Sequence, residues 1–333
     1  MTGSTSTTVP AKKSLFTTYS KTIEDGDLVI AYVNPLDMSA MTVRRGATLT
    51  NKYGAFPHDN VIGQPFGVRI ASTKGTGHIT FLHPTPELWT QTLPHRTQIL
   101  YMPDIALVSQ MLDLKPGRVV VESGTGSGSF SHSIARTIAP SGKLYTFEYH
   151  AERVAKFQEE LLAHGVPEEL VLCTHRDVCK KGFDLDGVAD AVFLDLPSPW
   201  EAIASAKNAL KRGRVGRLCS FSPAIEQVQK TCTELEKNGF YDIRMFETLI
   251  RKQEVKTIVR RHLPTRDALT GENAGDGENG DAEDGGDAVN PEDQVIVSRT
   301  LAKVAGHTSF LVFASVLPLD GALNGAEEEA MAS

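Results

Sequence analysis

The pattern of hydrophobic and polar positions changes at about residue 104. Before it, residues 26–82 hold short apolar segments, such as 27–33 and 77–82, separated by glycine and proline. Short apolar segments with this punctuation are typical of strands joined by turns. The pattern therefore predicts a small all-β domain over residues 22–82.

After residue 104, apolar segments of strand length alternate with longer segments of helical periodicity. This alternation predicts an α/β fold in which helices cover a parallel sheet. The predicted strands are 119–121, 143–147, 170–173, 189–194, 217–221 and 309–315. The predicted helices are 129–138, 151–164, 200–210 and 224–238. A further helix is predicted over 105–112, with Asp104 as its N-cap. The whole region, 104–317, is predicted to form one domain.

An acidic stretch interrupts this second domain. Residues 271–293 contain nine acidic residues and no lysine or arginine, and six glycines lie between 271 and 286. Such a stretch cannot bury enough apolar surface to offset its ordering entropy. We therefore predict a disordered insertion at about 268–295, forming a long hairpin loop between two strands of one sheet. The leader, 1–21, and the tail, 318–333, are also predicted to be disordered.

The net charge of −7 first suggests that the chain has no nucleic-acid partner. Without the nine acids of the insertion, however, 34 basic residues face 32 acidic ones, and the net charge becomes +2. The acidic total therefore does not argue against RNA. No apolar run approaches the ~20 residues of a membrane-spanning helix. The four cysteines form no Cys-x-x-Cys pair, so we expect free thiols, a reducing compartment and no metal site.

The strongest chemical signal is the sequence Glu-Ser-Gly-Thr-Gly-Ser-Gly-Ser at 122–129, between a predicted strand and a predicted helix. Gly124, Gly126 and Gly128 allow a sharp turn and close approach of the backbone to a ligand. Dinucleotide sites prefer Gly-x-Gly-x-x-Gly, whose third glycine would stand at Ser129. The form found here is usual in methyltransferases that use S-adenosylmethionine, and it favours that cofactor.

Acidic residues follow the next strands. Glu148 lies about 20 residues beyond the glycines, at a position suited to bind two ribose hydroxyls. Asp177 and Asp195 follow two further strands, whose carboxyl ends line the ligand crevice in open α/β sheets. Asp177 is equally well explained as a helix cap. Asp195 begins an Asp-Leu-Pro-Ser-Pro-Trp loop, a type that recurs in enzymes methylating nucleobase nitrogens.

The two predicted domains are joined by residues 83–103, which we expect to run over the crevice. Histidine, arginine, glutamine and tyrosine in this segment suit a phosphate and a stacked base. The alternative is a plain interdomain linker, and His83 and His95 taken singly favour that alternative.

Together, several motifs resemble the catalytic subunits of eukaryotic tRNA (adenine-58-N1)-methyltransferases. The matching segments are 83–89, 93–101, 122–129, 191–200, 219–223 and 306–310. The resemblance covers about 22–262 and 300–316. It implies a class I (Rossmann-like) methyltransferase sheet with a small N-terminal β-barrel-like domain, S-adenosylmethionine as cofactor and tRNA as substrate. It also implies a nuclear heterotetramer with a homologous non-catalytic subunit that lacks an intact glycine loop and catalytic aspartate, both of which this chain keeps.

The resemblance also implies roles for individual residues. The cofactor contacts it implies are Gln98, Leu100, Gly124, Gly126, Ser127, Gly128, Ser129, Glu148, Arg153, Asp177, Val178 and Asp195. The substrate side it implies consists of His95, Arg96, Tyr101, Trp200, Ser222, Pro223 and His307. Asp195 is the implied catalytic residue.

Chemistry alone gives Asp195 a role in this reaction. N1 of adenine has an in-plane lone pair and no proton at neutral pH, so no strong base is needed. A carboxylate that accepts a hydrogen bond from the exocyclic amine would orient the base and stabilise the positive charge that methylation creates. Two other hypotheses stay open: a protein or small-molecule methyltransferase of the isoaspartyl type, and a binding module without activity.

Overall fold

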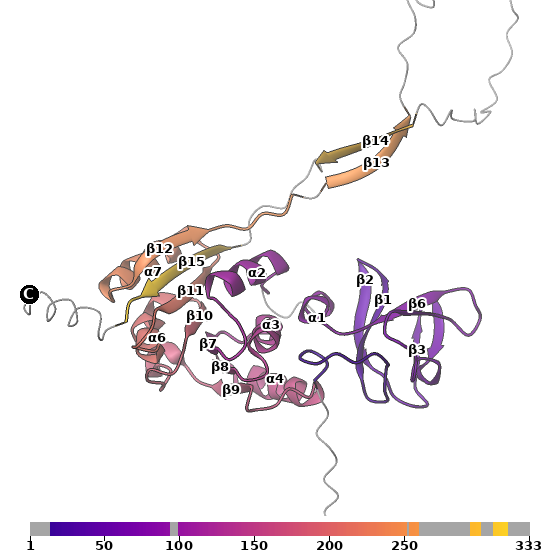
Figure 1. The fold of residues 1–333 in the computed structure, drawn as a ribbon, viewed down its shortest axis with the longest axis horizontal. Helices are drawn as coiled ribbons and strands as arrows, with labels where there is room; N and C mark the ends of the chain where they lie inside the picture. Colours follow the sequence, from indigo (N-terminus) through magenta and orange to yellow (C-terminus); the bar gives the residue numbers. More distant parts are fainter. Residues whose placement is uncertain (1–13, 94–98, 252, 260–293, 301–308, 319–333) are drawn as a thin grey trace, which may run out of the picture. The chain divides into compact units, whose positions relative to one another are not determined.

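The computed structural model describes residues 14–93, 99–251, 253–259, 294–300 and 309–318. The described residues divide between two compact units: those within 249–306 belong to one unit, and all the others belong to the main unit (Figure 1).

The described N-terminal part of the main unit contains two antiparallel β-sheets. Four strands form an antiparallel sheet in the order β2-β1-β6-β5, and β3 pairs with β4. The bounds are β1 (Leu28–Asn34), β2 (Asp37–Thr42), β3 (Thr48–Asn51), β4 (Gly54–Pro57), β5 (Val68–Ala71) and β6 (His78–Leu82), with a short 3-10 helix η1 (His58–Asn60). Ile23, Val29, Phe56 and Phe81 form its core. The predicted strand character of this region is therefore confirmed.

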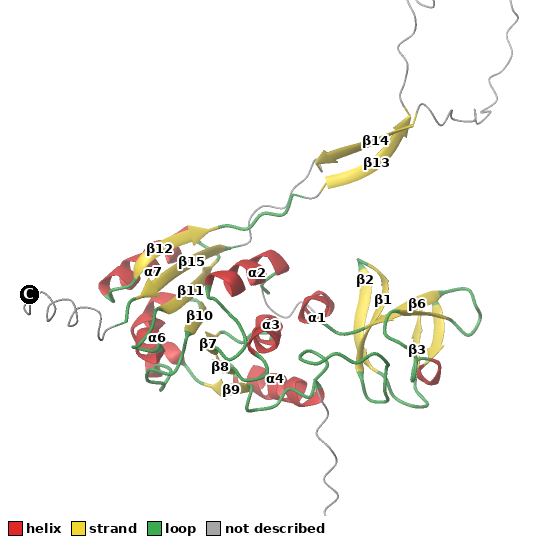
Figure 2. Ribbon diagram, viewed as in Figure 1, coloured by secondary structure: helices red, strands yellow, loops and turns green. Residues whose placement is uncertain are grey.

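The second part contains a seven-stranded sheet in the order β12-β15-β11-β10-β7-β8-β9. Neighbours among β7 to β11 pair in parallel, whereas β15 is antiparallel to β11 and β12 (Figure 2). The bounds are β7 (Val119–Ser123), β8 (Lys143–Glu148), β9 (Val171–His175), β10 (Ala191–Asp195), β11 (Gly216–Ser222), β12 (Tyr241–Phe246) and β15 (Phe310–Val316). The predicted parallel α/β sheet is confirmed; β12 was not predicted.

Helices cover both faces of this sheet, and successive residues of a strand pack into different hydrophobic cores. Val120 lies in one cluster with residues of α2, α3 and α4. Val121 lies in another with residues of α5, α6 and α7. Burial on both faces explains why the strands read as continuous apolar runs. The bounds are α1 (Pro86–Thr92), α2 (Met102–Met111), α3 (Ser129–Ile138), α4 (Ala151–Ala163), α5 (Val178–Lys181), η2 (Pro199–Ala202), α6 (Ile203–Ala209) and α7 (Ile225–Lys237).

The predicted start of α2 is wrong. The helix begins at Met102, with Tyr101 as N-cap and a proline in its first turn. Proline is favoured there because its missing N–H would have no partner in the helix. Asp104 is therefore inside the helix, where it is buried and accepts a hydrogen bond from Thr248.

The acidic insertion connects β13 (Gln253–Val259) to β14 (Gln294–Thr300), which pair antiparallel. The expected hairpin is confirmed. Its strands form a separate two-stranded sheet, however, so the expectation of one continuous domain over 104–317 is wrong at this point. Residues 268–293 of the predicted insertion and the tail from 319 onward lie outside the described residues.

The end of the predicted disordered leader is ordered. Phe16 is only 4% exposed, and its ring centroid lies 4.9 Å from that of His132 and 5.1 Å from that of His164. Trp89 packs edge-on against the same phenylalanine. The prediction of disorder is therefore wrong for residues 14–21, while 1–13 lie outside the described part. One anchoring aromatic in a Ser/Thr-rich segment produces no periodic pattern, which is why it was not predicted.

The connecting segment attaches the β-domain to the sheet domain through α1. The Thr90 hydroxyl lies 2.7 Å from the Ser129 hydroxyl at the start of α3, and both residues are buried. Arg136 on α3 donates hydrogen bonds to Glu87 on α1, one of them 2.8 Å long. Within the described residues, no helix is long and apolar enough to cross a membrane.

The burial of Phe16 leads to a test of stability. Phe16→Ala should lower the free energy of unfolding by about 3 kcal/mol, because it removes a buried ring and leaves a cavity. Denaturant unfolding followed by circular dichroism measures the change. Leu36→Ala is the control, because that side chain is 98% exposed, and it should change stability by less than about 0.5 kcal/mol. Equal effects of the two variants would show that the leader does not contribute to the core.

Candidate cofactor and substrate site

A cavity of about 710 Å³ opens where the parallel strands end. Its lining comes from the segments after β7, β8, β9, β10 and β11, at the sheet edge where α/β proteins bind ligands. Eight residues predicted from the sequence line it: Gly124, Gly126, Glu148, Arg153, Asp177, Val178, Asp195 and Pro223.

The glycine loop lies against the Asp195 backbone. The Gly124 N–H donates to the Phe147 carbonyl oxygen at 2.9 Å, and a Cβ on Gly124 would overlap the carbonyl oxygen of Asp195. Gly128 has a φ of 74°, and a Cβ there would overlap the Phe157 ring. Both positions therefore require glycine, and the first brings the loop directly beside Asp195.

A buried histidine pair holds the end of this loop. His132 Nδ1 lies 2.7 Å from the Gly128 carbonyl oxygen, and His132 Nε2 lies 2.9 Å from His164 Nδ1. Because a carbonyl only accepts, Nδ1 of His132 carries the proton and its Nε2 accepts from His164. Burial lowers the pKa of His132 to about 4, so the ring is neutral at pH 7. Sequence reasoning missed this pair, because nothing in the sequence connects residues 32 positions apart.

Glu148 is the best-held acid of the cavity. One carboxylate oxygen accepts from the Gly126 N–H at 3.0 Å, and the other accepts from the His150 N–H at 3.0 Å. The Arg153 guanidinium lies 3.7 Å away. Each oxygen keeps a second lone pair, so the group can still accept two hydroxyl hydrogen bonds, as a ribose would donate.

Asp177 is a helix cap, which was the alternative that the sequence left open, and it also lines the cavity. It is the N-cap of α5 and accepts from the Lys180 N–H at 3.3 Å. The same residue, with the buried Val178, borders the cavity.

Asp195 ends β10, and its environment disfavours a negative charge. Burial raises the pKa of the Asp195 carboxyl to about 7, and the Glu148 carboxylate contributes to the shift. Burial also raises the pKa of Glu122 to about 7, although a hydrogen bond from Ser131 opposes the shift. A cation in the cavity would favour the ionised form of these groups.

Gln227 joins the two loops around Asp195. Its amide nitrogen donates to the Pro197 carbonyl oxygen at 2.9 Å, and its amide oxygen accepts from the Ala224 N–H at 3.2 Å. It therefore bridges the loop after β10 and the loop after β11, and it also borders the cavity. Sequence reasoning missed it, because its partners are known only once the two strands are neighbours.

Other predicted site residues lie outside this cavity. Leu100 belongs to a hydrophobic core, Ser129 bonds to Thr90, and Ser127 borders a separate cavity of about 180 Å³. Ser222 is buried in β11, and Tyr101 is 44% exposed at the start of α2. Trp200 packs against the second core, with the Lys230 ammonium 4.8 Å from its ring centroid. His95, Arg96, Gln98 and His307 lie outside the described residues.

The cavity fits S-adenosylmethionine. Gly124 and Gly126 line the cavity without side chains, and Glu148 offers acceptors for a ribose. The carboxyls of Asp195 and Glu148 suit a cation such as a sulfonium. Among the described residues, no group of three His, Cys, Asp or Glu side chains could hold a metal ion.

Comparison with known proteins gives matches at family and fold level. A family model described as tRNA methyltransferase complex GCD14 subunit matches residues 77–316. The tRNA (adenine(58)-N(1))-methyltransferase catalytic subunit TRM61 of Cryptococcus neoformans is 50% identical over 237 residues, which cover 71% of this chain and 54% of the relative. The chain therefore spans about half the length of this relative.

Two solved structures share the fold. A SAM-dependent O-methyltransferase from Thermotoga maritima has a TM-score of 0.69 and 25% identity, covering 90% of this chain and 97% of its own. The tRNA (m1A58) methyltransferase TrmI from Aquifex aeolicus has a TM-score of 0.62 and 22% identity, covering 88% and 98%. The expected class I methyltransferase fold and its cofactor class are confirmed. The two names differ in the acceptor, so the fold does not identify the acceptor.

The packing of Gly124 leads to a binding test. Gly124→Ala should weaken S-adenosylmethionine binding by at least about tenfold, because the new methyl group would displace the loop from Asp195. Isothermal titration calorimetry measures the dissociation constant. Gly213→Ala is the matched control, since no atom lies within 4 Å of a Cβ built there. Equal affinities of the two variants would contradict the proposed role of the close approach.

The buried carboxyls lead to a test of pH dependence. An unfolded carboxyl has a pKa near 4, so the folded protein keeps these protons to higher pH than the unfolded chain. The contribution of these carboxyls to the stability of the folded state is complete below about pH 4 and is lost as the pH rises to about 7. Asp195→Asn should therefore reduce the loss of unfolding free energy between about pH 5 and pH 8 in urea titrations. Asp186→Asn, whose side chain is 71% exposed, is the control; an Asp195→Asn slope equal to that of the control would contradict the assignment.

Proposed function

This chain belongs to the family of tRNA methyltransferase complex GCD14 subunits, and we propose that it is the catalytic subunit that transfers a methyl group from S-adenosylmethionine to N1 of adenine 58 in tRNA. The observation that carries the proposal is the meeting of the glycine loop, Glu148 and Asp195 around one cavity. The name of the Cryptococcus relative supports the same acceptor.

The cofactor supplies an electrophilic methyl group on a positively charged sulfur. In the transfer, the adenine N1 lone pair forms the new N–C bond, the S–CH₃ bond breaks, and its electron pair stays on sulfur. The ring gains the positive charge. The protein removes no proton in this step, so its residues act by orientation and by electrostatic stabilisation.

Asp195 is the residue that meets the developing charge. Its carboxylate accepts a hydrogen bond from the exocyclic amine, whose nitrogen shares the charge of the methylated ring. The Asp195 carboxyl must be ionised for this role. Burial raises its pKa to about 7, and the positive charge of the cofactor lowers the pKa again. Gln227 keeps the Asp195 loop and the Pro223 loop together, so that carboxylate and acceptor base stay aligned.

The acceptor atom lies on the pairing edge of adenine, so the base must be unpaired and extruded to react. The exposed ring of Tyr101 is available for stacking on such a base. Neither Tyr101 nor Trp200, the other stacking partner suggested by the sequence, lines the cavity. Trp200 is partly buried against the second core, so we assign the stacking to Tyr101.

The family match concerns a subunit of a complex, and the proposal extends to its assembly. We place this chain in a heterotetramer with a homologous non-catalytic subunit, acting in the nucleus, on the resemblance of its motifs alone. Mass measurement of the native complex tests the assembly, and microscopy of the tagged chain tests the location. A lone chain, or a tag excluded from the nucleus, would contradict the respective statement.

Substitution of Asp195 tests the mechanism. Asp195→Ala should lower methyl transfer to tRNA by about 10²–10³-fold, the usual effect of removing one charge-stabilising group. Binding of S-adenosylmethionine should change only modestly. The measurement uses the complex purified through the tagged chain, radiolabelled cofactor, and mass spectrometry of tRNA nucleosides for 1-methyladenosine.

Two controls make this test specific. Asp186→Ala removes an acid whose side chain is 71% exposed, and it should leave the rate unchanged. Undiminished turnover of Asp195→Ala would remove Asp195 from the mechanism. Label that enters protein carboxyl groups and not tRNA would instead select the isoaspartyl-type alternative, which the O-methyltransferase name of one structural neighbour keeps open.

A further inference from the structure

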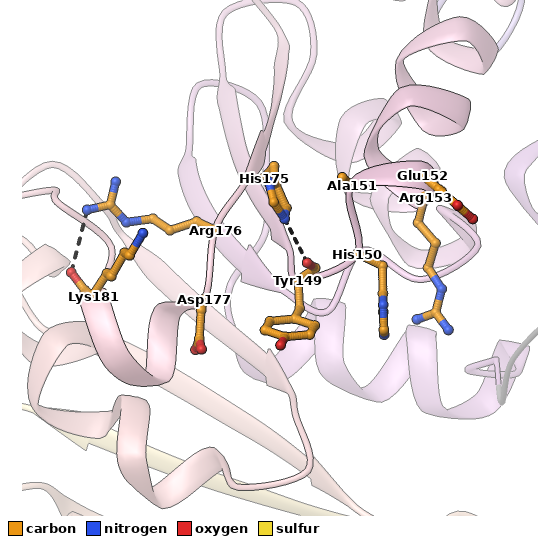
Figure 3. A pocket seen from close by; sticks show the side chains of 9 residues that line it. All are labelled: Tyr149, His150, Ala151, Glu152, Arg153, His175, Arg176, Asp177 and Lys181. Carbon is orange, nitrogen blue, oxygen red and sulfur yellow. Dashed lines mark hydrogen bonds between the residues drawn. The ribbon is translucent and has the colours of Figure 1, made fainter.

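A second cavity of about 790 Å³ adjoins the cofactor cavity at the ends of β8 and β9 (Figure 3). The two cavities share five lining residues: Tyr149, His150, Arg153, Arg176 and Asp177. Tyr149, His150 and Arg153 come from the turn into α4 and its first residues. Arg176 and Lys181 come from the segment after β9. We call this cavity the basic groove.

Positive charge predominates in the basic groove. Arg153, Arg176 and Lys181 are cationic, and Glu152 and Asp177 are its acids. Arg176 donates to the Gly182 carbonyl oxygen at 2.8 Å and lies 3.5 Å from the Asp184 carboxylate, and Arg153 lies 3.7 Å from the Glu148 carboxylate. Lys181 forms no ion pair with any residue that the structure describes. Its charge is therefore available to a ligand.

The cofactor does not account for Lys181, which lines the basic groove and not the cofactor cavity. S-adenosylmethionine carries no phosphate, and its only anionic group is the carboxylate of its methionine part. Glu148 lies at the end of β8 and, as the ribose ligand, places the adenosine part next to the basic groove. Cations at the adenosine end thus have no anionic partner in the cofactor. A polyanion would supply one.

We propose that the basic groove binds backbone phosphates of the tRNA substrate. This inference rests on the proposed function, whose substrate is a polyanion. The groove is within reach of the reacting base: β9 is three strand positions from β10 in the sheet, a distance on the order of 14 Å at the usual strand spacing. Tyr149, which lines the basic groove, is 61% exposed. Bases of single-stranded RNA stack on such aromatic rings.

Charge reversal at Lys181 tests the proposal. In the complex purified through the tagged chain, Lys181→Glu should weaken tRNA binding by about threefold to tenfold and reduce the slope of log K against log salt by about 1. Fluorescence anisotropy with labelled tRNA measures both quantities. The dissociation constant for S-adenosylmethionine, from calorimetry, should stay within about twofold, because Lys181 contacts no cofactor group in this scheme.

Lys115→Glu is the matched control. It makes the same change of charge in the segment before β7, at the amino ends of the parallel strands. The Lys115 side chain is 56% exposed, and among the described residues it pairs only with Asp113. Equal tRNA affinities of the two variants would overturn the proposal. Loss of cofactor binding in Lys181→Glu would also overturn it, because the basic groove would then belong to the cofactor site.

A crosslinking measurement on the wild-type complex does not depend on any variant. tRNA containing 4-thiouridine should crosslink to the tryptic peptide 144–153, which carries Tyr149 and His150. Absence of this peptide among the crosslinked ones would contradict the proposal. A wild-type complex that binds tRNA without methylating it would contradict the proposed function instead, so the two failures are distinguishable.

Discussion

The contact between the Gly124 backbone and the Asp195 carbonyl is the constraint on which the site depends. It joins the loop after β7 to the loop after β10, two neighbouring strands of the sheet. No side chain fits between them, so the glycine loop and Asp195 are fixed relative to each other. In the function that we propose, cofactor binding and methyl transfer would therefore share one piece of backbone geometry.

Residues packed behind the glycine loop stabilise that contact. Gly128 ends the loop against Phe157, and His132 ties its carbonyl oxygen to His164 at the end of α4. Phe16 and Trp89 pack on the same histidines. The ordered end of the leader and the connecting helix α1 therefore contribute to the rigidity of the cofactor loop, although neither borders the cavity.

Charge is distributed along the sheet edge in a way that matches two different ligands. The carboxyls of Glu122, Glu148 and Asp195 lie around the glycine loop, and burial raises the pKa of Glu122 and Asp195 to about 7. Such a site favours a cationic ligand. The basic groove beside it carries the opposite charge and suits phosphates. The net charge of the whole chain shows neither feature, because the acidic insertion dominates the total.

The sequence by itself determined the parallel sheet, the glycine loop and the acids at the strand ends, including Glu148 and Asp195. Each depends on a local pattern: runs of buried apolar residues, glycines that the backbone requires, and positions counted from a strand. Only the tertiary structure decided that Phe16 is anchored, that Trp200 lies outside the cavity, that Gln227 and His132 position the loops, and that β13 and β14 form their own sheet. Their partners are distant along the chain, and a contact between distant residues leaves no periodic or local signal.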